Sequence, residues 1–504
     1  MMKRVRRAVS CVLLIGMLVS AVPVHAAAAG FTDVPADSWA AASIQRAVEL
    51  GFFQGESDTT FGMGHRMTRA AFAVVLCRFF GWEEIHPAQS TYTDVQDPQA
   101  WYYGAVEAGY AHGALTRQTE TFRPADPITR EELAVMLVRA LGYGTIAGLA
   151  QSLPMPFTDV RTNTGYIAMA YELGLISGTG ATTFSPSAIA TREQVAVILM
   201  RLYDKLQQGA PSRFGVLPSG EGVPPLTGLS AVAVSGTRVL YSGRPILNAS
   251  LDAQALQARK QAVVAAGAQA LLHVSGSVSV LRNGEAQETA ALLADTVSQG
   301  GWDGLLLDIP QAGQQERGAM TALVRALSDA LGDDRTLYVV AEAPVWDGTA
   351  YEGYDYAALS PSADCLVVRV APYEGDGGFP TAPLEPLEEV YYALAELRGT
   401  VPAEKLALML TTTGTRWVDG KRSGQVDASE LEALLADEDT QRYYAGRYAC
   451  AYLSYTQREQ EAVVWYLDQA AVTERVRMAG FFGVDQVCLS DVSSVSEQVL
   501  AGLG

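Results

Sequence analysis

The chain has 504 residues, 49% of them hydrophobic, and a formal net charge of −19. This length and apolar fraction allow two to four domains, each with a core of its own. The acidic composition disfavours nucleic acid and anionic membranes as partners, because both carry negative charge themselves.

The first 26 residues have the pattern of a signal peptide. Four basic residues between positions 3 and 7 precede an apolar run over residues 8–22, and Ala26 closes a small-residue cleavage site. The sequence therefore predicts a signal peptide over residues 1–26 and a secreted chain. No later stretch reaches the roughly 20 apolar residues that a spanning helix needs, so no membrane span is expected after cleavage.

The cysteines and histidines do not predict a metal site or a cofactor. Cys77, Cys365, Cys450 and Cys488 are widely spaced, and each lies in an apolar segment. We therefore expect buried free thiols rather than a disulfide framework or a zinc site. The histidines, His273 among them, are too scattered to indicate more than local hydrogen bonding.

Two short motifs recur three times in the first half of the chain. An aromatic-Thr-Asp-Val sequence begins at residues 31, 92 and 157, and a Thr-Arg pair ends at residues 69, 130 and 192. Because both markers keep nearly the same spacing, the sequence predicts three tandem structural units. We expect these units to span residues 27–90, 91–150 and 151–208.

Each unit is expected to form two helices joined by a loop. The recurring positions are an aspartate that can cap the first helix (Asp33, Asp94, Asp159), a glycine that ends it (Gly51, Gly113, Gly174), a loop phenylalanine that can fill the space between helices (Phe61, Phe122, Phe184) and a threonine that can cap the second helix (Thr68, Thr129, Thr191).

With these motifs, residues 31 to about 206 resemble the S-layer homology family. The resemblance implies an all-α helical bundle of pseudo-threefold form whose grooves bind secondary cell-wall polysaccharide, often pyruvylated, on the wall or S-layer surface of a bacterium. It implies that the ligand is contacted by the motif arginines Arg69, Arg130 and Arg192 and by the aromatic residues Trp39 and Trp101.

The chemistry of these residues agrees with that role. A guanidinium can bind a carboxylate or phosphate with paired donors, and an aromatic face can stack on a sugar ring. Surface salt bridges are the alternative role for the arginines. Two positions depart from the family pattern, since the first unit has Ala71 where Glu is usual and the third has Tyr166 in place of the Trp.

Residues 209–228 are rich in Gly and Pro and predict a linker. Beyond them, residues 229–504 alternate apolar runs with amphipathic stretches, which favours an α/β domain with a parallel sheet closed as a TIM-barrel-like (β/α)8 barrel. The expected strands are residues 231–234, 270–274, 304–309, 337–341, 366–370, 406–410 and 486–489.

Several segments of this second domain resemble glycoside hydrolase family 18, the chitinase-like barrels. They are the Gly-Trp-Asp-Gly segment that begins at Gly301, the strand over residues 401–408 and the Val-Trp-Tyr segment around Trp465. The resemblance implies a glycan groove, for which Asp303, Asp308, Tyr373 and Trp465 are the candidates.

The residues that would cut a glycosidic bond are altered. Alternate strand residues share a face, so positions 306, 308 and 310 should point into the barrel mouth together. Active members of the family have Asp, Asp and Glu there, and this chain has Leu306, Asp308 and Pro310. Proline cannot donate a proton, so the usual general acid is missing. Asp308, Glu342 and Glu374 are the candidate catalytic replacements.

Two functions remain open. The first is a secreted protein anchored to the wall, with peptidoglycan or secondary cell-wall polysaccharide as partner and a degenerate barrel, a pseudoenzyme, that binds a glycan without cleaving it. The alternative is an active wall-associated glycoside hydrolase acting on β-1,4-linked N-acetylglucosamine polymers such as chitin or peptidoglycan.

Overall fold

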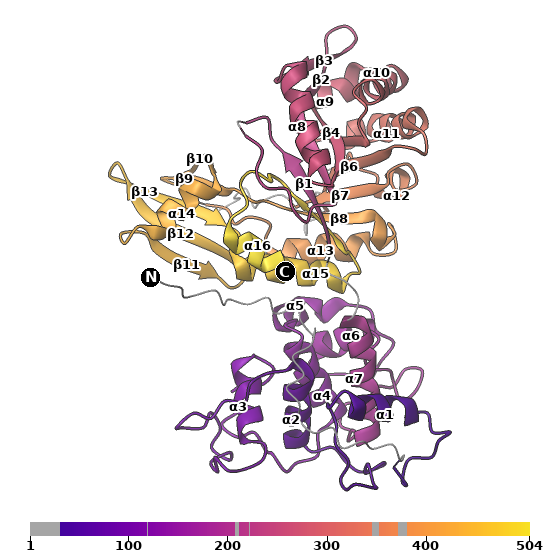
Figure 1. Cartoon of the computed structure of the whole chain (residues 1–504), viewed down its shortest axis with the longest axis vertical. Coiled ribbons are helices and arrows are strands. Elements are labelled where there is room, and N and C mark those ends of the chain that lie inside the picture. Colours follow the sequence, from indigo (N-terminus) through magenta and orange to yellow (C-terminus); the bar gives the residue numbers. More distant parts are fainter. Residues whose placement is uncertain are drawn as a thin grey trace. The chain divides into compact units, whose positions relative to one another are not determined.

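The computed structural model describes residues 31–117, 119–206, 211–220, 222–344, 352–370 and 381–503. They form two compact units, residues 31–206 and residues 211–503 (Figure 1). The first unit is rich in helices. These are α1 (Ala41–Glu49), α2 (Arg69–Phe80), α3 (Tyr103–Ala111), α4 (Arg130–Ala140), α5 (Gly144–Leu149), the 3₁₀ helix η1 (Ala150–Ser152), α6 (Thr164–Glu172) and α7 (Arg192–Leu206).

Each repeat contributes two main helices joined by a loop, as expected: α1 and α2, α3 and α4, α6 and α7. The glycine that follows each first helix has a left-handed backbone, with φ of 76° at Gly51, 74° at Gly113 and 67° at Gly174. Only glycine adopts this conformation without a steric penalty, which explains why the helix ends there.

The threonine caps are confirmed in two of the three repeats. Thr68 accepts the N–H of Ala71, and Thr129 forms a full capping box with Glu132. In the third repeat, the Thr191 hydroxyl has no partner among the described residues, and the Thr191 N–H donates instead to the side chain of Gln194.

The expectation that the motif aspartates cap the first helices is wrong. The Asp33 carboxylate accepts three consecutive N–H groups of the loop, from Phe61, Gly62 and Met63, at 2.7–2.9 Å. Asp94 and Asp159 each accept two consecutive N–H groups of the equivalent loops. These loops turn consecutive N–H groups toward one point, and a carboxylate satisfies several of them at once.

Hydrogen bonds connect the three repeats in a closed cycle. The N–H of Met67 donates to the carbonyl of Ala190 at 2.9 Å, Ala190 donates to Ile128 at 3.0 Å, and Ile128 donates back to Met67 at 2.8 Å. Each of these residues lies just before the second helix of its repeat. Phe61, Phe122 and Phe184 are fully buried, as their loop positions predicted.

Eight parallel strands close into a barrel in the second unit. Their order is β1-β14-β8-β7-β6-β5-β4-β2, and β2 pairs back with β1. The strands are β1 (Ser212–Leu217), β2 (Ala231–Tyr241), β4 (Gln269–Gly276), β5 (Gly304–Asp308), β6 (Thr336–Glu342), β7 (Cys365–Arg369), β8 (Leu406–Leu410) and β14 (Gln486–Leu489). β3 (Pro245–Ala249) extends β2 as an antiparallel neighbour. The predicted (β/α)8 barrel is confirmed, and all seven expected strands are present.

The barrel begins earlier than the composition predicted. Strand β1 lies inside residues 209–228, which were expected to be a linker, and it pairs in parallel with both β14 and β2. Without these six residues the sheet would not close. The linker prediction is therefore wrong for this part of the range.

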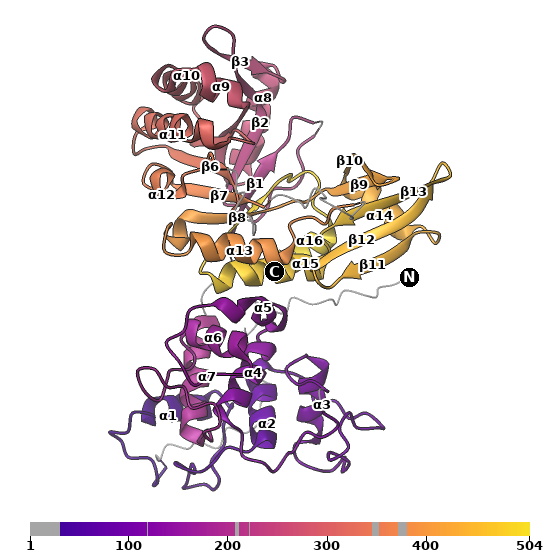
Figure 2. The same cartoon turned by 180° about the vertical axis from the view of Figure 1, so that it is seen from behind.

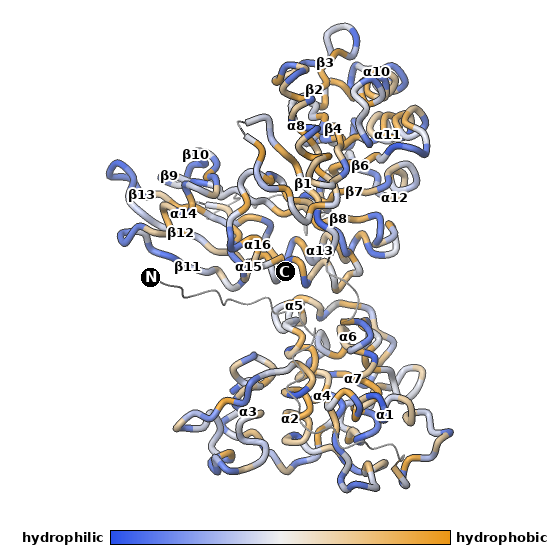
Figure 3. Tube along the Cα trace, viewed as in Figure 1, coloured by the Kyte–Doolittle hydropathy of each residue, from blue (hydrophilic) through white to orange (hydrophobic). Residues whose placement is uncertain are grey.

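Helices lie outside the barrel strands, and hydrophilic residues mark many of the connecting loops (Figures 2 and 3). The helices of this unit are α8 (Ala253–Ala265), α9 (Val278–Asn283), α10 (Ala286–Gln299), η2 (Gln314–Glu316), α11 (Arg317–Leu331), α12 (Tyr356–Leu359), α13 (Leu387–Leu397), η3 (Ala403–Lys405), α14 (Ala428–Ala436), α15 (Gln469–Phe481) and α16 (Glu497–Leu503). The barrel interior is packed with side chains that include Phe214, Leu271, Leu306, Val340 and Met409.

A second sheet is inserted between β8 and β14, and the sequence did not predict it. Its five antiparallel strands have the order β10-β9-β13-β12-β11. They are β9 (Gly414–Val418), β10 (Lys421–Val426), β11 (Gln441–Ala445), β12 (Cys450–Gln457) and β13 (Gln460–Tyr466). An apolar cluster that includes Val426, Leu431 and Val464 packs α14 against one face of this sheet.

Candidate functional site

The mouth of the barrel holds a cluster of three charged side chains. Asp308, Glu342 and Arg369 are the last residues of β5, β6 and β7, three neighbouring parallel strands. In a parallel barrel the carboxyl ends of the strands meet at one face, which is where such folds place their chemistry. Two of the candidate catalytic residues, Asp308 and Glu342, are thus brought together.

A single guanidinium binds both carboxylates. Arg369 donates from Nη1 and Nη2 to the two oxygens of Asp308, each at 2.9 Å. It also donates from Nε and Nη2 to Glu342 Oε1, at 3.1 and 2.8 Å. The three side chains are only 17%, 7% and 26% exposed for Asp308, Glu342 and Arg369. Bidentate, partly desolvated pairs of this kind are the strong ones.

His273 and Ser235 extend the cluster toward β4 and β2. His273 Nδ1 lies 2.6 Å from the Ser235 hydroxyl, and its Nε2 lies 3.9 Å from Asp308 Oδ2. Burial by itself would raise the pKa of Asp308, but the neighbouring His273 and Arg369 act more strongly in the opposite direction and lower it to about 2. These contacts favour the ionised form of Asp308 at neutral pH.

Positions 306 and 310, each two residues from Asp308, carry no acid. Leu306 is fully buried in the barrel interior, which confirms that alternate residues of this strand point inward. Pro310 follows the strand, and the carbonyl of Ile309 accepts the hydroxyl of Tyr354 at 2.6 Å. This arrangement holds negative charge but offers no general acid at the place where the family has its Glu.

Two groove candidates lie away from this cluster. Asp303 precedes the first residue of β5 and accepts the N–H of Ala270 at 2.8 Å, so it stands at the other end of the strand, about 17 Å from Asp308 by strand length. Trp465 belongs to β13 of the inserted sheet, is buried, and donates to the Thr381 hydroxyl at 2.8 Å. Neither residue is part of the mouth cluster. Tyr373 and Glu374 lie outside the described residues.

Sequence reasoning missed Arg369, His273 and Ser235 as members of the cluster. Arg369 and His273 both occupy inward positions of their strands, at even spacing from Val367 and Leu271 of the interior. Strand alternation could have placed them inside the barrel. It could not have shown which carboxylates they meet, because Asp308 lies 61 residues from Arg369 in the sequence.

The first unit has a second candidate site, repeated at each contact between neighbouring repeats. The Nε of each motif arginine donates to the carbonyl of the loop phenylalanine in the next repeat. The pairs are Arg69 with Phe122 at 2.7 Å, Arg130 with Phe184 at 3.0 Å and Arg192 with Phe61 at 3.0 Å. Each guanidinium also lies over the ring of the same phenylalanine, 4.7–4.9 Å from its centre.

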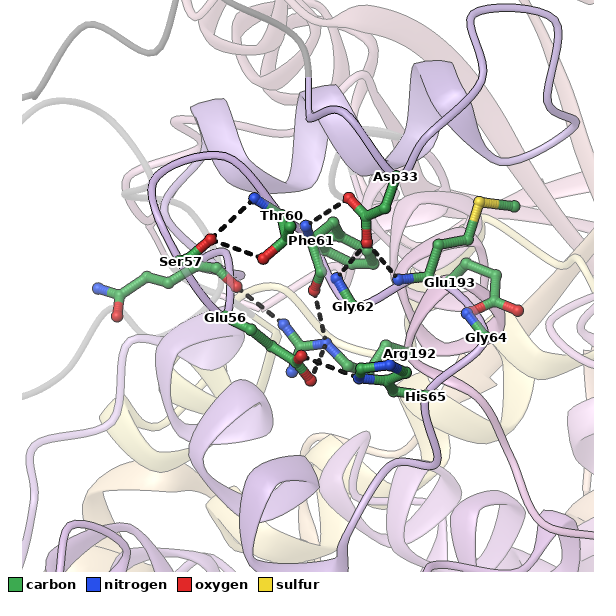
Figure 4. A network of polar contacts seen from close by, with 12 residues as sticks. Asp33, Glu56, Ser57, Thr60, Phe61, Gly62, Gly64, His65, Arg192 and Glu193 are labelled. Atoms are coloured by element: carbon green, nitrogen blue, oxygen red, sulfur yellow. Dashed lines mark hydrogen bonds and ion pairs between the residues drawn. The ribbon is translucent and has the colours of Figure 1, made fainter.

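We call these three contacts the first, second and third junctions, after Arg69, Arg130 and Arg192. Figure 4 shows the third junction, where the loop of the first repeat meets Arg192 and the side chain of Glu56 lies beside it. Burial lowers the pKa of all three arginines, but the guanidinium of arginine stays charged at any physiological pH. The motif arginines therefore hold neighbouring repeats together, whatever else they bind.

The aromatic candidates of this unit are open to solvent. Trp39 and Trp101 are each 63% exposed and lie two residues before α1 and α3. The equivalent position before α6 is Thr162, whereas Tyr166 lies inside that helix and pairs with Arg139 at 2.5 Å. The expectation that Tyr166 replaces the Trp is therefore wrong by four residues.

Comparisons with known proteins agree with this division. The family model described as "S-layer homology domain" matches residues 30–73, 91–134 and 156–196, and the one described as "Glycosyl hydrolases family 18" matches residues 257–481. The chain is similar to an endoglucanase of Bacillus sp. (strain KSM-635), with 31% identity over 40% of this chain and 23% of the relative. It is also similar to an S-layer protein of Bacillus thuringiensis subsp. finitimus, with 29% identity over 36% of this chain and 22% of the relative.

Among solved structures, a chitinase of Chromobacterium violaceum matches with a TM-score of 0.51 and 18% identity, over 58% of this chain and 98% of the other. That identity shows the fold alone. The chain spans less than a quarter of the length of the two curated relatives named above.

The closed parallel barrel with charged residues at its carboxyl end defines a TIM-barrel domain. This chain carries three S-layer homology domains followed by a glycosyl hydrolase family 18 domain.

Among the residues that the structure describes, no helix is both long and apolar enough to cross a membrane. The same residues contain no group of three or more His, Cys, Asp and Glu side chains placed to hold a metal ion.

Proposed function

We propose that this protein is anchored to the bacterial cell wall by its S-layer homology domains and carries a barrel that binds glycan without cleaving it. The anchoring partner is secondary cell-wall polysaccharide or peptidoglycan. The S-layer homology domains indicate a location at the cell-wall surface. Secretion through a signal peptide at residues 1–26 belongs to the same proposal, and those residues lie outside the described part of the chain.

The contacts between repeats support the anchoring role. The cyclic hydrogen bonds of Met67, Ala190 and Ile128 and the three equivalent arginine junctions favour a pseudo-threefold arrangement of the helices. Trp39 and Trp101 are exposed aromatic rings, the kind of surface on which sugar rings stack. Three linked sites of modest affinity on one chain would also give strong retention on a polymer through multivalency.

One observation carries the proposal for the barrel: the Arg369 guanidinium binds both carboxylates of the mouth. Asp308 is held as an anion, and Glu342 has one of its oxygens committed to Arg369. With Pro310 in the place of the acid, no residue of β5 can protonate a leaving group. The loss of general acid catalysis is worth roughly 10² to 10⁴ in rate.

The alternative, an active hydrolase, is favoured by the position of the same two carboxylates. Asp308 and Glu342 do lie at the mouth, where a retaining or an inverting mechanism would need a pair of acids. For Glu342 to act, its side chain would have to leave Arg369 and reach a bound sugar.

Turnover decides between the two proposals for the barrel. Incubation of the chain with chitooligosaccharides and with peptidoglycan, followed by mass spectrometry of the soluble products, should give no fragments beyond those of a protein-free control. Product formation that disappears in Glu342→Gln or Asp308→Asn would establish the hydrolase instead. Gln425→Asn, an exposed change on the inserted sheet, is the matched control.

The anchoring role is tested by sedimentation. The chain should pellet with purified cell walls, and combined replacement of Arg69, Arg130 and Arg192 by Ala should release it. Because these arginines also join the repeats, the variant's helical content must be checked by circular dichroism. Pelleting that is unchanged in a folded triple variant would remove the arginines from the binding role.

A further inference from the structure

Ser235 and His273 form a hydrogen-bonded pair at the barrel mouth, on the neighbouring strands β2 and β4. Ala233 and Leu271, two residues before them, belong to the barrel interior, so both side chains point inward from the next layer toward the mouth. The Ser235 hydroxyl lies 2.6 Å from His273 Nδ1, and both residues are only partly buried. A serine hydroxyl within hydrogen-bond distance of an imidazole is the arrangement that activates serine as a nucleophile.

Strand β2 is irregular at Ser235. Its pairing with β4 shifts register between Val234 and Thr237, and Gly236 has a φ of 139°. A strand with an extra residue bends and aims a side chain in a new direction, and such bulges are frequent next to active sites. A Cβ at Gly236 would also lie 3.0 Å from Leu251 Cδ1. A glycine is therefore needed beside Ser235, and the bulge sets the direction of the Ser235 hydroxyl.

Asp308 lies on the other side of the imidazole ring. Its Oδ2 is 3.9 Å from His273 Nε2, a buried nitrogen that has no hydrogen-bond partner among the described residues. An unprotonated Nε2 would direct its lone pair at the carboxylate, so the ring proton is favoured on Nε2. Nδ1 is then the acceptor for the Ser235 hydroxyl. The distance of 3.9 Å is longer than a hydrogen bond, as catalytic hydrogen bonds often are before a substrate binds.

The charges around the ring favour a proton on His273 during a reaction. Two carboxylates, those of Asp308 and Glu342, surround the single guanidinium of Arg369, which leaves one net negative charge when all three are ionised. A neighbouring negative charge stabilises an imidazolium. His273 can therefore take the proton of Ser235 and return it to a leaving group.

An ester is the bond that suits these groups. Cleavage of a glycosidic bond needs a separate general acid, which is missing at Pro310, whereas the oxygen that leaves an ester takes back the proton held by His273. A short acyl group is favoured over a long chain, because the layer beneath Ser235 is filled by buried side chains, among them Ala233, Leu271 and Leu306. A glycan at the mouth would present such groups as acetyl esters of its hydroxyls.

We propose that the barrel mouth is an esterase site that removes O-acetyl groups from a bound glycan, with Ser235 as nucleophile, His273 as general base and Asp308 as a positioning residue. The Ser235 oxygen bonds to the acetyl carbonyl carbon while its proton passes to His273. The bond between that carbon and the sugar oxygen then breaks, and the sugar oxygen leaves with the proton. Water attacks the acetyl-serine, gives one proton to His273 and forms acetic acid, and this proton returns to Ser235. The glycan chain itself stays intact.

Reaction with a fluorophosphonate tests the nucleophile without any glycan. The full chain should gain one phosphonyl group, located on Ser235 by mass spectrometry of its peptides, and the denatured chain should gain none. Ser235→Ala should abolish the labelling, and His273→Gln should slow it about 10²-fold or more, the usual value of general base catalysis. Ser242→Ala, which changes an exposed serine in the turn after β2, is the matched control and should leave the rate unchanged. Circular dichroism checks that each variant is folded.

Asp308 acts through His273, so the pH profile of the labelling tests its role. The rate should rise with pH as His273 loses its proton. In Asp308→Asn this rise should occur at a lower pH, because the ring loses the anion that favours its proton while Arg369 keeps its positive charge. A purely structural Asp308 would change the rate without moving the pH of the rise, and that result would remove its positioning role.

Release of acetate tests the substrate, whose choice rests on the proposed glycan binding by the barrel. Chitooligosaccharides and wall polysaccharide that carry chemically added O-acetyl groups should lose acetate to the full chain without becoming shorter. Ser235→Ala should release no more acetate than a protein-free control.

The outcomes separate the esterase from the proposed glycan binding. No labelling of the folded chain, labelling on another residue, or an unchanged rate in His273→Gln would overturn the inference and leave wall anchoring and glycan binding in place. Labelling of Ser235 without release of acetate would overturn the assignment of a glycan ester as substrate. A chain that binds no wall glycan but labels at Ser235 would contradict the proposed function and still support the nucleophile.

Discussion

Asp308 is retained at a position where the family has a catalytic carboxylate, but its contacts are different here. Its partner is Arg369, the last residue of β7, which binds both of its oxygens. Burial alone would lower the pKa of Arg369, but the neighbouring carboxylates of Asp308 and Glu342 act more strongly and hold it above its usual range. We therefore propose that Asp308 stabilises the barrel mouth instead of serving catalysis of glycoside hydrolysis.

This role predicts a specific dependence of stability on pH. The pKa of Asp308 is lowered to about 2 in the folded chain, against about 3.9 when unfolded, so ionisation contributes about 2.5 kcal/mol to the free energy of unfolding. Since the folded pKa is the lower one, this contribution is complete above pH ~4 and is lost as the pH falls through about 2. Asp308→Asn should therefore destabilise the barrel more at pH 6 than at pH 2.5, as measured by urea unfolding. A penalty that is the same at both pH values would contradict the ion pair.

At the scale of elements, β1 is the strand that the composition concealed and the barrel requires. It is six residues long, is flanked by glycines and prolines, and pairs on both sides with parallel strands. Its packing leaves no room at Gly215, where an added Cβ would lie 2.5 Å from Val492 Cγ1 and 2.8 Å from the Leu489 carbonyl oxygen.

Gly215→Ala should accordingly destabilise the barrel by about 1–3 kcal/mol, because the backbone of β14 must shift to admit the methyl group. Gly220→Ala is the matched control, since nothing lies within 4 Å of its added Cβ. Thermal unfolding of both variants would show the difference. Equal stability of the two would mean that β1 is not packed against β14 as described.

Sequence alone predicted the barrel strands well because buried parallel strands are continuous apolar runs, as residues 304–308 and 406–410 are. The inserted sheet escaped prediction because its edge strands β10 and β11 are almost wholly exposed and carry no apolar alternation. The cluster at the mouth could be predicted only in part. Asp308 and Glu342 came from motif and strand position, whereas Arg369 acquires its role only when the barrel brings β5, β6 and β7 together.

At the scale of the whole molecule, wall binding and the barrel belong to different units. Each unit has a core of its own, so each should fold alone. A fragment of residues 31–206 should therefore show cooperative thermal unfolding and pellet with cell walls as the full chain does. A fragment of residues 211–503 should fold but lack that strong retention. A helical fragment that is unfolded, or folded but unbound, would contradict this division.

The most direct test measures binding and cleavage on one sample of peptidoglycan-containing wall. The full chain is incubated with the wall, the bound fraction is measured in the pellet, and new reducing ends are measured in pellet and supernatant over hours. We predict that most of the chain is found in the pellet and that the number of reducing ends stays at that of untreated wall. A chain that stays in solution, or a steady release of reducing ends that is lost in Glu342→Gln, would contradict it.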